Sequence, residues 1–410
     1  MNKKKESKVV PNVRFKGFTD DWKQRKLGDD LVSIHTGTNL LGSITNTGMP
    51  LIKMGNIQRG YFDTSKVEFL AENEQPDKAD IANYGDFFFN TRNTLELVGK
   101  GATWMKNSGE YAFNSNIARF ELRNLDTIFF NYLYNTDYMT KQIHARAMGT
   151  TSVAAIYPKT LDSVEYSASC MKEQQKIGAY FKQLDNLITL HQQKITLLTK
   201  LKKTMLEKMF PKKGTVIPEF RFNGFANAWK QRKLGELYQR NTERNENLIG
   251  YDKTISVATM SYKDDGNGAS ESSLSTYKVL RVGDIAFEGH KNKQFRFGRF
   301  VVNDIGTGIM SPRFSALRPL NEMPVNFWKQ YIHSESVIRG ILVKSTKAGT
   351  MMNELVIPEF LNQTIMIPSE NEQAVIGQYF ASLDNLITLH QRKIDKIKNM
   401  KKAMLDQMFI

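Results

Sequence analysis

The stretch LDNLITLHQ occurs twice in this chain, at residues 184–192 and again at residues 383–391. Around it, KEQQKIGAYFKQLDNLITLHQQKI at 172–195 returns as NEQAVIGQYFASLDNLITLHQRKI at 371–394. A second pair lies further out, where RFKGFTDDWKQRKLG at 14–28 returns as RFNGFANAWKQRKLG at 221–235. Because a long internal repeat determines architecture before any single motif does, the sequence predicts two similar halves related by a pseudo-twofold axis.

In the longer repeat, apolar residues recur at alternating steps of four and three positions, which is typical of one long helix with a buried stripe. In the first copy the predicted seam is Ile177, Phe181, Leu184, Ile188, His191, Ile195 and Leu198, continuing to Met205 and Met209 after a gap at Lys202. In the second copy it is Ile376, Phe380, Leu383, Ile387, His390, Ile394 and Ile397, continuing to Met404 and Met408 after a gap at Lys401. With about 1.5 Å of rise per residue, each helix is about 60 Å long.

Two apolar stripes of this length have to be buried, and each helix offers the other a matching partner. The intervening block of about 150 residues is long enough for the chain to return, so an antiparallel coiled coil is expected. The midpoints of the helices then fall near His191 and His390, which we expect to face one another. The open alternative is that each histidine is a half-exposed seam residue that only sets the register.

Between the repeats lie two blocks, Asp29–Met171 and Glu236–Glu370, that resemble each other only faintly. Short apolar runs such as GDFFFN at 85–90 and GDIAFE at 283–288 are bounded by turn residues, which favours strands over helices. Each block is therefore predicted to be an α+β domain. Divergence here and identity in the repeats indicate two different recognition tasks on one shared framework.

The formal charge of +15 and the pI near 9.5 make a polyanion, and nucleic acid above all, the first partner to consider. An anionic membrane surface ranks second to nucleic acid, and no membrane partner is expected for a chain that binds nucleic acid. No membrane-spanning helix is expected either, because no apolar run reaches about 18 residues, and the absence of a signal-peptide pattern predicts a cytoplasmic protein. The single cysteine, Cys170, and six scattered histidines predict neither a disulfide nor a metal site.

Catalytic signatures are absent from the sequence. Gly37–Gly42 and Gly55–Gly60 have the glycine spacing of a phosphate-binding loop, but Ser43 and Tyr61 follow them instead of lysine. The motifs of an amino-methyltransferase and of a metal-dependent nuclease are also missing. No catalytic residue is therefore predicted, and the chain is expected to be a recognition protein without an activity of its own.

DNA contacts are predicted in the two variable blocks, after the aligned Gly-Asp pairs. Cations neutralise phosphates, while Asn, Arg, Lys and Thr can hydrogen-bond base edges. The candidates are Thr91, Arg92, Asn93 and Lys100 in the first block and His290, Lys291, Asn292, Lys293, Arg296 and Arg299 in the second. The alternative for each residue is a solvated charged loop. WKQRKLG, identical in both halves at 22–28 and 229–235, cannot read different bases and is expected to be a packing and docking element.

The duplicated EQxxIGxYFxxLDNLITLHQxKI helix starts, together with GDFFFNTRN at 85–93 and GDIAFEGHKNK at 283–293, resemble the specificity subunit of type I restriction-modification systems over the whole chain. The resemblance implies target-recognition domains at 1–158 and 214–358. It implies a long helix with linker at 159–213 and a second long helix at 359–410. Each domain is then expected to read one half of an asymmetric double-stranded DNA site, across a spacer that the coiled coil sets.

The resemblance also implies partners: two methyltransferase subunits, joined by restriction and translocation subunits. S-adenosylmethionine, ATP and magnesium would belong to those partners, and no cofactor is expected in this chain. Two other functions remain open from the residues alone. One is a stand-alone sequence-specific DNA-binding regulator, and the other is a coiled-coil assembly scaffold.

Overall fold

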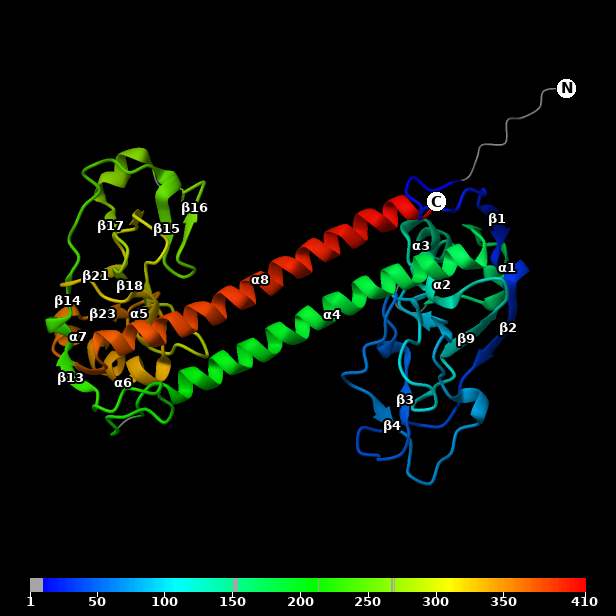
Figure 1. Ribbon diagram of the computed structural model, residues 1–410, viewed down its shortest axis with the longest axis horizontal. Coiled ribbons are helices and arrows are strands. Elements are labelled where there is room, and N and C mark those ends of the chain that lie inside the picture. Colours follow the sequence, from blue (N-terminus) through cyan, green and yellow to red (C-terminus); the bar gives the residue numbers. More distant parts are fainter. Residues whose placement is uncertain (1–9, 150–153, 213, 267, 269) are drawn as a thin grey trace. The chain divides into compact units, whose positions relative to one another are not determined.

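The computed structural model describes residues 10–149, 154–212, 214–266, 268 and 270–410. The chain divides into two compact units. Unit 1 consists of Met1–His191 and Lys393–Ile410, and unit 2 of Gln192–Arg392. Both units contain parts of the two long helices, α4 (Met171–Lys208) and α8 (Glu370–Met408), which Figure 1 shows in green and in orange to red.

Unit 1 is built around a four-stranded antiparallel sheet with the strand order β2-β9-β5-β7. Phe87 and Phe89 of the central strand β5 pack into the core that contains the helices, while Phe88 packs into a second core beneath the smaller sheet β4-β3-β8. The strands are β2 (Leu31–Thr36), β3 (Pro50–Ile52), β4 (Glu68–Phe69), β5 (Phe87–Asn90), β7 (Gly101–Thr103), β8 (Ala112–Phe113) and β9 (Ile117–Leu122), followed by helices α2 (Thr127–Tyr134) and α3 (Asp137–His144).

Unit 2 repeats this topology in a variable block that resembles the variable block of unit 1 only faintly. Its sheet has the order β14-β21-β18-β19, and a second sheet has the order β16-β15-β20-β17. In both units the second sheet contains one parallel pair, β3 with β8 and β15 with β20. The elements are β14 (Tyr238–Arg240), β15 (Thr254–Ser256), β16 (Ser261–Lys263), β17 (Lys278–Leu280), β18 (Ile285–Glu288), β19 (Arg299–Val302), β20 (Gly308–Met310), β21 (Ser315–Pro319), α5 (Val325–Tyr331), α6 (Glu335–Ser345) and α7 (Ile357–Leu361). Two α+β domains of one fold are thus confirmed.

The repeated WKQRKLG segments are packing elements, as expected. Strand β1 (Lys23–Lys26) pairs with β12 (Glu165–Ala168), and β13 (Lys230–Lys233) pairs with β24 (Thr364–Ile367) in the equivalent antiparallel register. Trp22 and Trp229 are each 3% exposed. Backbone pairing of these strands and the buried tryptophans therefore hold the start of each domain against the strand that leads into each long helix.

The two repeated sequences contact each other, which explains why they recur together. Arg14 forms a bidentate ion pair with Glu173 at 2.8 and 2.7 Å, and Arg221 forms the same pair with Glu372 at 2.6 and 2.7 Å. Both glutamates are buried, and the hydrogen bonds to them raise the pKa of Arg14 and of Arg221. Since a buried charge is tolerated only with a partner, each Arg–Glu pair ties one domain to the start of one helix.

The long helices pack antiparallel within each unit. In unit 1 the first half of α4 packs with the last part of α8, where Phe409 lies against Phe181 and Trp22. In unit 2 the last part of α4 packs with the first half of α8, where Phe210 lies against Phe380. The predicted antiparallel coiled coil is confirmed in both units.

The proposed seam positions differ in burial. Ile177, Phe181, Leu184, Ile376, Phe380, Leu383 and Ile394 are buried, while Ile188, His191, Ile195, Leu198, Ile387, His390 and Ile397 are half-buried. The two gaps in the heptad pattern have a structural reason. Lys401 reaches Asp185 at 2.5 Å in unit 1, and Lys202 reaches Asp384 at 2.6 Å in unit 2.

These ion pairs define the helix register, because they are equivalent under the internal repeat. Asp185 on α4 is level with Lys401 on α8 in unit 1. Because the helices run antiparallel, His191, six residues after Asp185, is level with Asp395, six residues before Lys401. The expected pairing of His191 with His390 joins residues of different units and stays a prediction.

The helices begin later than the boundaries expected from the sequence. Residues 158 and 358 fall inside short helical segments, η3 (Pro158–Ser163) and α7. Strands β12 and β24 follow before α4 begins at Met171 and α8 at Glu370. The domain limits at 158 and 358 therefore remain a proposal, whereas the helix limits are those of α4 and α8.

The register predicts the outcome of a charge exchange in unit 2. Lys202→Asp places two carboxylates side by side and is expected to lower the free energy of unfolding by about 1 kcal/mol. Adding Asp384→Lys restores the attraction and most of the stability. Thermal unfolding followed by circular dichroism measures both effects. Lys203→Asp, at an exposed position outside the seam, is the matched control, and rescue of that variant by Asp384→Lys would contradict the register.

Candidate nucleic-acid interface

In unit 2 the predicted DNA-binding residues lie on one structured loop, Gly289–Arg299, which joins β18 to β19 and is called the basic loop below. The Asn292 side chain accepts hydrogen bonds from the backbone N–H groups of Gln294 and Phe295, at 2.9 and 2.8 Å. Phe295 is 4% exposed and packs on His333, with ring centroids 5.1 Å apart. These contacts give the loop a defined shape, so Lys291, Lys293 and Arg296 are exposed on a fixed backbone.

His290 and Arg299 differ from the other candidates because a buried carboxylate holds them. Glu288, at the end of β18, is 4% exposed. Its side chain lies 2.5 Å from His290 Nδ1 and 3.4 Å from Arg299 Nε. Arg299 also donates to the carbonyl of Ala258 at 2.8 Å and lies over the Phe295 ring at 5.1 Å. Arg299 therefore supports the loop, while the partly exposed His290 can still contact a ligand.

Glu288 was not among the predicted residues, although it stands beside them in the sequence. An acidic residue is a poor candidate for binding DNA, so a selection by charge includes the basic residues beside Glu288 and omits Glu288 itself. The available signal was its position at the end of a buried strand, because a carboxylate that is buried there needs a cationic partner nearby.

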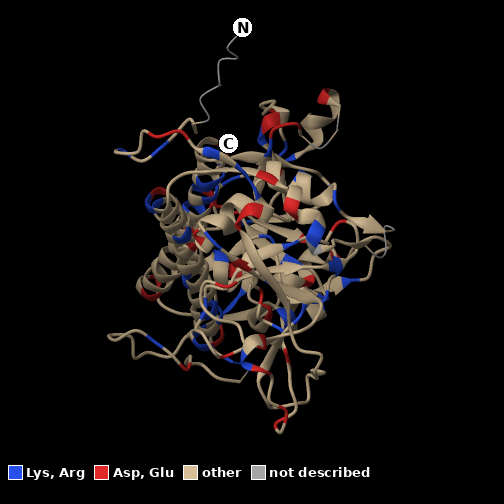
Figure 2. Cartoon of the chain, turned by 90° about the vertical axis from the view of Figure 1, so that its right-hand side faces the viewer, with Lys and Arg blue, Asp and Glu red and all other residues tan. Residues whose placement is uncertain are grey.

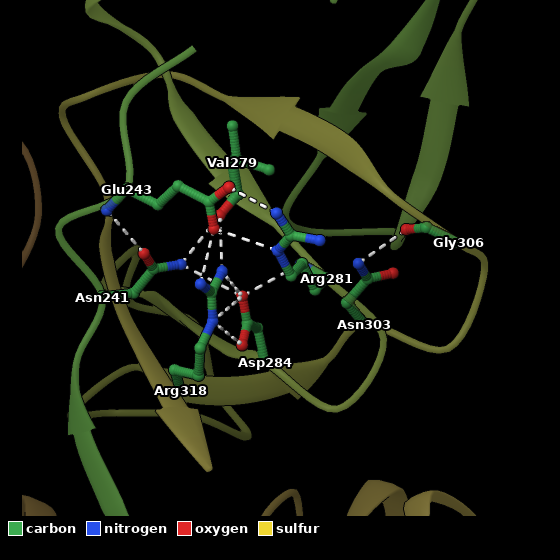
Figure 3. A network of polar contacts seen from close by, with 8 residues as sticks. All are labelled: Asn241, Glu243, Val279, Arg281, Asp284, Asn303, Gly306 and Arg318. Atoms are coloured by element: carbon green, nitrogen blue, oxygen red, sulfur yellow. Dashed lines mark hydrogen bonds and ion pairs between the residues drawn. The ribbon is translucent and has the colours of Figure 1, made fainter. Parts of the chain in front are cut away.

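A network of charges anchors the other end of β18 (Figure 3). Arg318 of β21 donates to Asp284 at 2.8 and 3.0 Å and to Glu243 at 2.5 Å. Arg281 donates to Glu243 at 2.7 and 3.0 Å. The hydrogen bonds from Arg281, with those from Arg318, lower the pKa of Glu243 to about 2. The buried Asn241 side chain donates to Asp284 at 3.0 Å, so the strand that carries the basic loop is fixed by satisfied polar contacts.

A short hairpin lies against the basic loop. Its strands are β22 (Thr346–Lys347) and β23 (Glu354–Leu355). The backbone N–H of Asn353 donates to the Gly289 carbonyl at 2.9 Å, and the Asn353 side chain donates to the Arg296 carbonyl at 3.1 Å. A Cβ at Gly289 would lie 2.0 Å from the Asn353 carbonyl oxygen, which explains the glycine. No periodicity in the sequence predicted this contact between segments about 60 residues apart.

In unit 1 the predicted residues occupy the equivalent place, directly after β5. Thr91 donates to the Asn116 carbonyl at 3.0 Å. Arg92 and Asn93 form β6, which pairs with β11 (Ala154–Ala155), and β11 pairs with β10 (Met148–Gly149). Arg92 is exposed and Asn93 half-buried. The sheet β10-β11-β6 corresponds to the hairpin beside the basic loop of unit 2.

Lys100 belongs to a second basic group in unit 1. Its Nζ donates to Gln58 Oε1 at 2.8 Å, and burial together with the nearby Arg59 lowers the pKa of Lys100. Arg59 lies 3.0 Å from His144 Nε2. Gln58, Arg59 and His144 were not predicted, because they come from a loop and a helix far from Lys100 in the sequence.

The equivalent strand ends carry different polar residues in the two units. Asn90 ends β5 where Glu288 ends β18. Asn90 is fully buried, and its amide atoms have no hydrogen-bond partner among the described residues. The two surfaces thus have the same backbone topology but different polar side chains, which suits the recognition of two different nucleic-acid sequences.

Charge alone does not single out these surfaces. Figure 2 shows basic and acidic residues interspersed along the chain. Within the described residues, no group of three or more His, Cys, Asp or Glu side chains is arranged to hold a metal ion. No helix in the described part of the chain is both long and apolar enough to cross a membrane.

The repeated segment lines a hollow in unit 2 with a volume of about 460 Å³. Its walls include Arg221, Lys230 and Arg232 from the repeat and Glu370 and Glu372 from the start of α8. Residues of the variable block, among them Asn321, Met323 and Trp328, complete the walls, so the hollow lies between the shared framework and the variable domain of unit 2.

Comparisons with known proteins agree with this arrangement. The family model described as the type I restriction modification DNA specificity domain matches twice, at residues 19–200 and 208–399. Two specificity subunits from Methanocaldococcus jannaschii are similar over 94% of this chain and 92% of their own length. They are the putative type I restriction enzyme MjaX specificity subunit, 23% identical, and the MjaVIII specificity subunit, 22% identical.

The fold is also that of a solved relative. The type I restriction-modification S subunit from M. genitalium aligns with a TM-score of 0.62 at 13% identity, covering 98% of this chain and 99% of that one. With two family domains that together span most of the sequence, the chain belongs to the type I restriction-modification DNA specificity family.

Proposed function

We propose that this chain reads an asymmetric, split DNA site through two surfaces, one in each unit. In unit 2 the surface is the basic loop with its hairpin, and in unit 1 it is the region of Thr91–Asn93 with Lys100. The observation that carries the proposal is the equivalent place of these surfaces, each following the central strand of the same sheet. We assign the target-recognition domains to residues 1–158 and 214–358.

Members of this family are the non-catalytic DNA-recognition components of type I restriction-modification complexes. Family membership therefore favours this function over a stand-alone regulator or an assembly scaffold. The chain supplies specificity, and the transfer and cleavage reactions belong to other subunits. We place this work in the cytoplasm, where double-stranded host DNA is accessible.

The framework that both halves share is the proposed docking site for two methyltransferase subunits. Two copies of the same surface can bind two copies of the same partner. The ion pairs Arg14–Glu173 and Arg221–Glu372 hold the repeated segments in the same local arrangement in both halves. The helices also expose equivalent leucines outside the seam, Leu187 and Leu190 on α4 and Leu386 and Leu389 on α8. Exposed apolar side chains in matching positions suit an interface with a protein partner. Restriction subunits complete the proposed assembly.

The long helices are the proposed source of the spacer between the half-sites. Each is continuous over 38 or 39 residues, which corresponds to about 57 Å at 1.5 Å per residue. Half-sites one DNA turn apart are separated by about 34 Å, so helices of this length are sufficient to bridge them.

The first test is to express the chain with its methyltransferase subunit and to map methylated adenines in the host genome. The expected motif has two specified parts separated by unread bases. Replacing residues 29–171 with the block of a relative should then change one part only, because each domain reads independently. A change in both parts of the motif, or a motif without unread bases, would refute independent recognition by the two domains.

The exposed cations of the basic loop are expected to set the salt dependence of binding. Removing both in a Lys291→Ala, Lys293→Ala variant should weaken binding and reduce the slope of log K against log salt by about two, at about 0.9 per lost phosphate contact. Titration of the assembled complex with duplex DNA at several salt concentrations measures the slope. Arg244→Ala, an exposed cation beside β17, is the control and should leave the slope unchanged.

A further inference from the structure

The tip of the hairpin in unit 2, residues 348–353, presents an apolar side chain to solvent. Met351 is 77% exposed. A single exposed apolar residue is common on protein surfaces and means little by itself. What gives Met351 significance is the backbone that carries it and the charges that surround it.

Asn353, two residues after Met351, fixes the hairpin tip to the basic loop. Asn353 is 6% exposed, and its backbone and side chain donate to the carbonyls of Gly289 and Arg296, at 2.9 and 3.1 Å. Because two separate hydrogen bonds tie the tip to the loop, Met351 is held beside the proposed DNA surface and does not belong to an independent loop.

The surroundings of the tip are basic. Lys291, Lys293 and Arg296 are exposed on the loop, and Lys347 is exposed on β22. Of the acidic groups, Glu288 is buried against His290 and Arg299, while Glu354 is the cross-strand neighbour of Lys347. An apolar side chain with cations around it is complementary to a DNA groove, because the cations can contact the phosphates while the apolar side chain contacts the base edges between them.

We propose that the hairpin tip enters the major groove and that Met351 contacts the 5-methyl group of a thymine in the half-site that unit 2 reads. A two-stranded ribbon fits the major groove, and the thymine methyl is the apolar group displayed there. The flexible, polarisable thioether of methionine suits such a contact. This inference rests on the proposed DNA surface of unit 2 and adds a base-reading residue that carries no charge.

Deoxyuridine provides the test, because it differs from thymidine only by that methyl group. Each thymidine of the half-site, on both strands, is replaced in turn, and the affinity of the complex with its methyltransferase subunits is measured at fixed salt. For the unaltered chain, one replacement should weaken binding about fourfold, the effect of exposing one buried methyl group. Met351→Ala should bind thymidine DNA about as weakly and lose its response to that replacement. Met351→Leu should retain a response.

Leu248→Ala is the matched control, since Leu248 is 71% exposed in unit 2 but lies in the segment beside β17. It should keep the full response to deoxyuridine. The inference is overturned if no replacement weakens binding, if Met351→Ala keeps the response, or if the half-site contains no thymine. If instead Lys291→Ala, Lys293→Ala leaves affinity unchanged, the proposed DNA surface itself is wrong, so the two failures are distinguishable.

Discussion

The rest of the structure depends on one constraint, which is that the apolar stripes of α4 and α8 have to be buried. Within each unit this is achieved by antiparallel packing with a domain core at the end of the seam. Phe409 completes the core of unit 1 and Phe210 that of unit 2, so the end of each helix is part of a folded domain. Polar contacts then select the register, because the two heptad positions that carry a lysine, Lys401 and Lys202, form ion pairs with Asp185 and Asp384.

On this framework, identity and divergence have separate physical causes. The repeated sequences contact each other: Arg14 and Arg221 need Glu173 and Glu372, and these buried pairs tolerate no independent change. Gly178 recurs as Gly377 because a Cβ there would meet the backbone of α2 or α5, at 2.8 and 2.7 Å. Glu288 is also held by ion pairs, but its partners His290 and Arg299 belong to the same variable block, so this surface can change together with its partners while the sheets stay alike.

Much of the framework was predictable from sequence, because heptad spacing depends on residue type and separation alone. The antiparallel pairing of the long helices follows from that logic and is confirmed. The packing role of Trp22 and Trp229 follows from the identity of WKQRKLG in both halves, and both side chains are buried. The surfaces were only partly predictable. The basic loop was visible as a run of cations, but Glu288, Arg59 and the hairpin at Asn353 depend on contacts between distant segments. The contacts of the candidate residues with DNA bases stay a prediction, because they depend on how a duplex docks.

The central proposal is that the paired long helices set the number of unread bases between the two half-sites. It is tested most directly by inserting one heptad into both helices, between Gln193 and Lys194 and between Arg392 and Lys393, and mapping the methylated motif. Seven residues preserve the seam and add about 10 Å, so both specified parts should persist while the unread gap grows by about three base pairs. An unchanged gap together with intact methylation, or altered specified bases, would contradict the account.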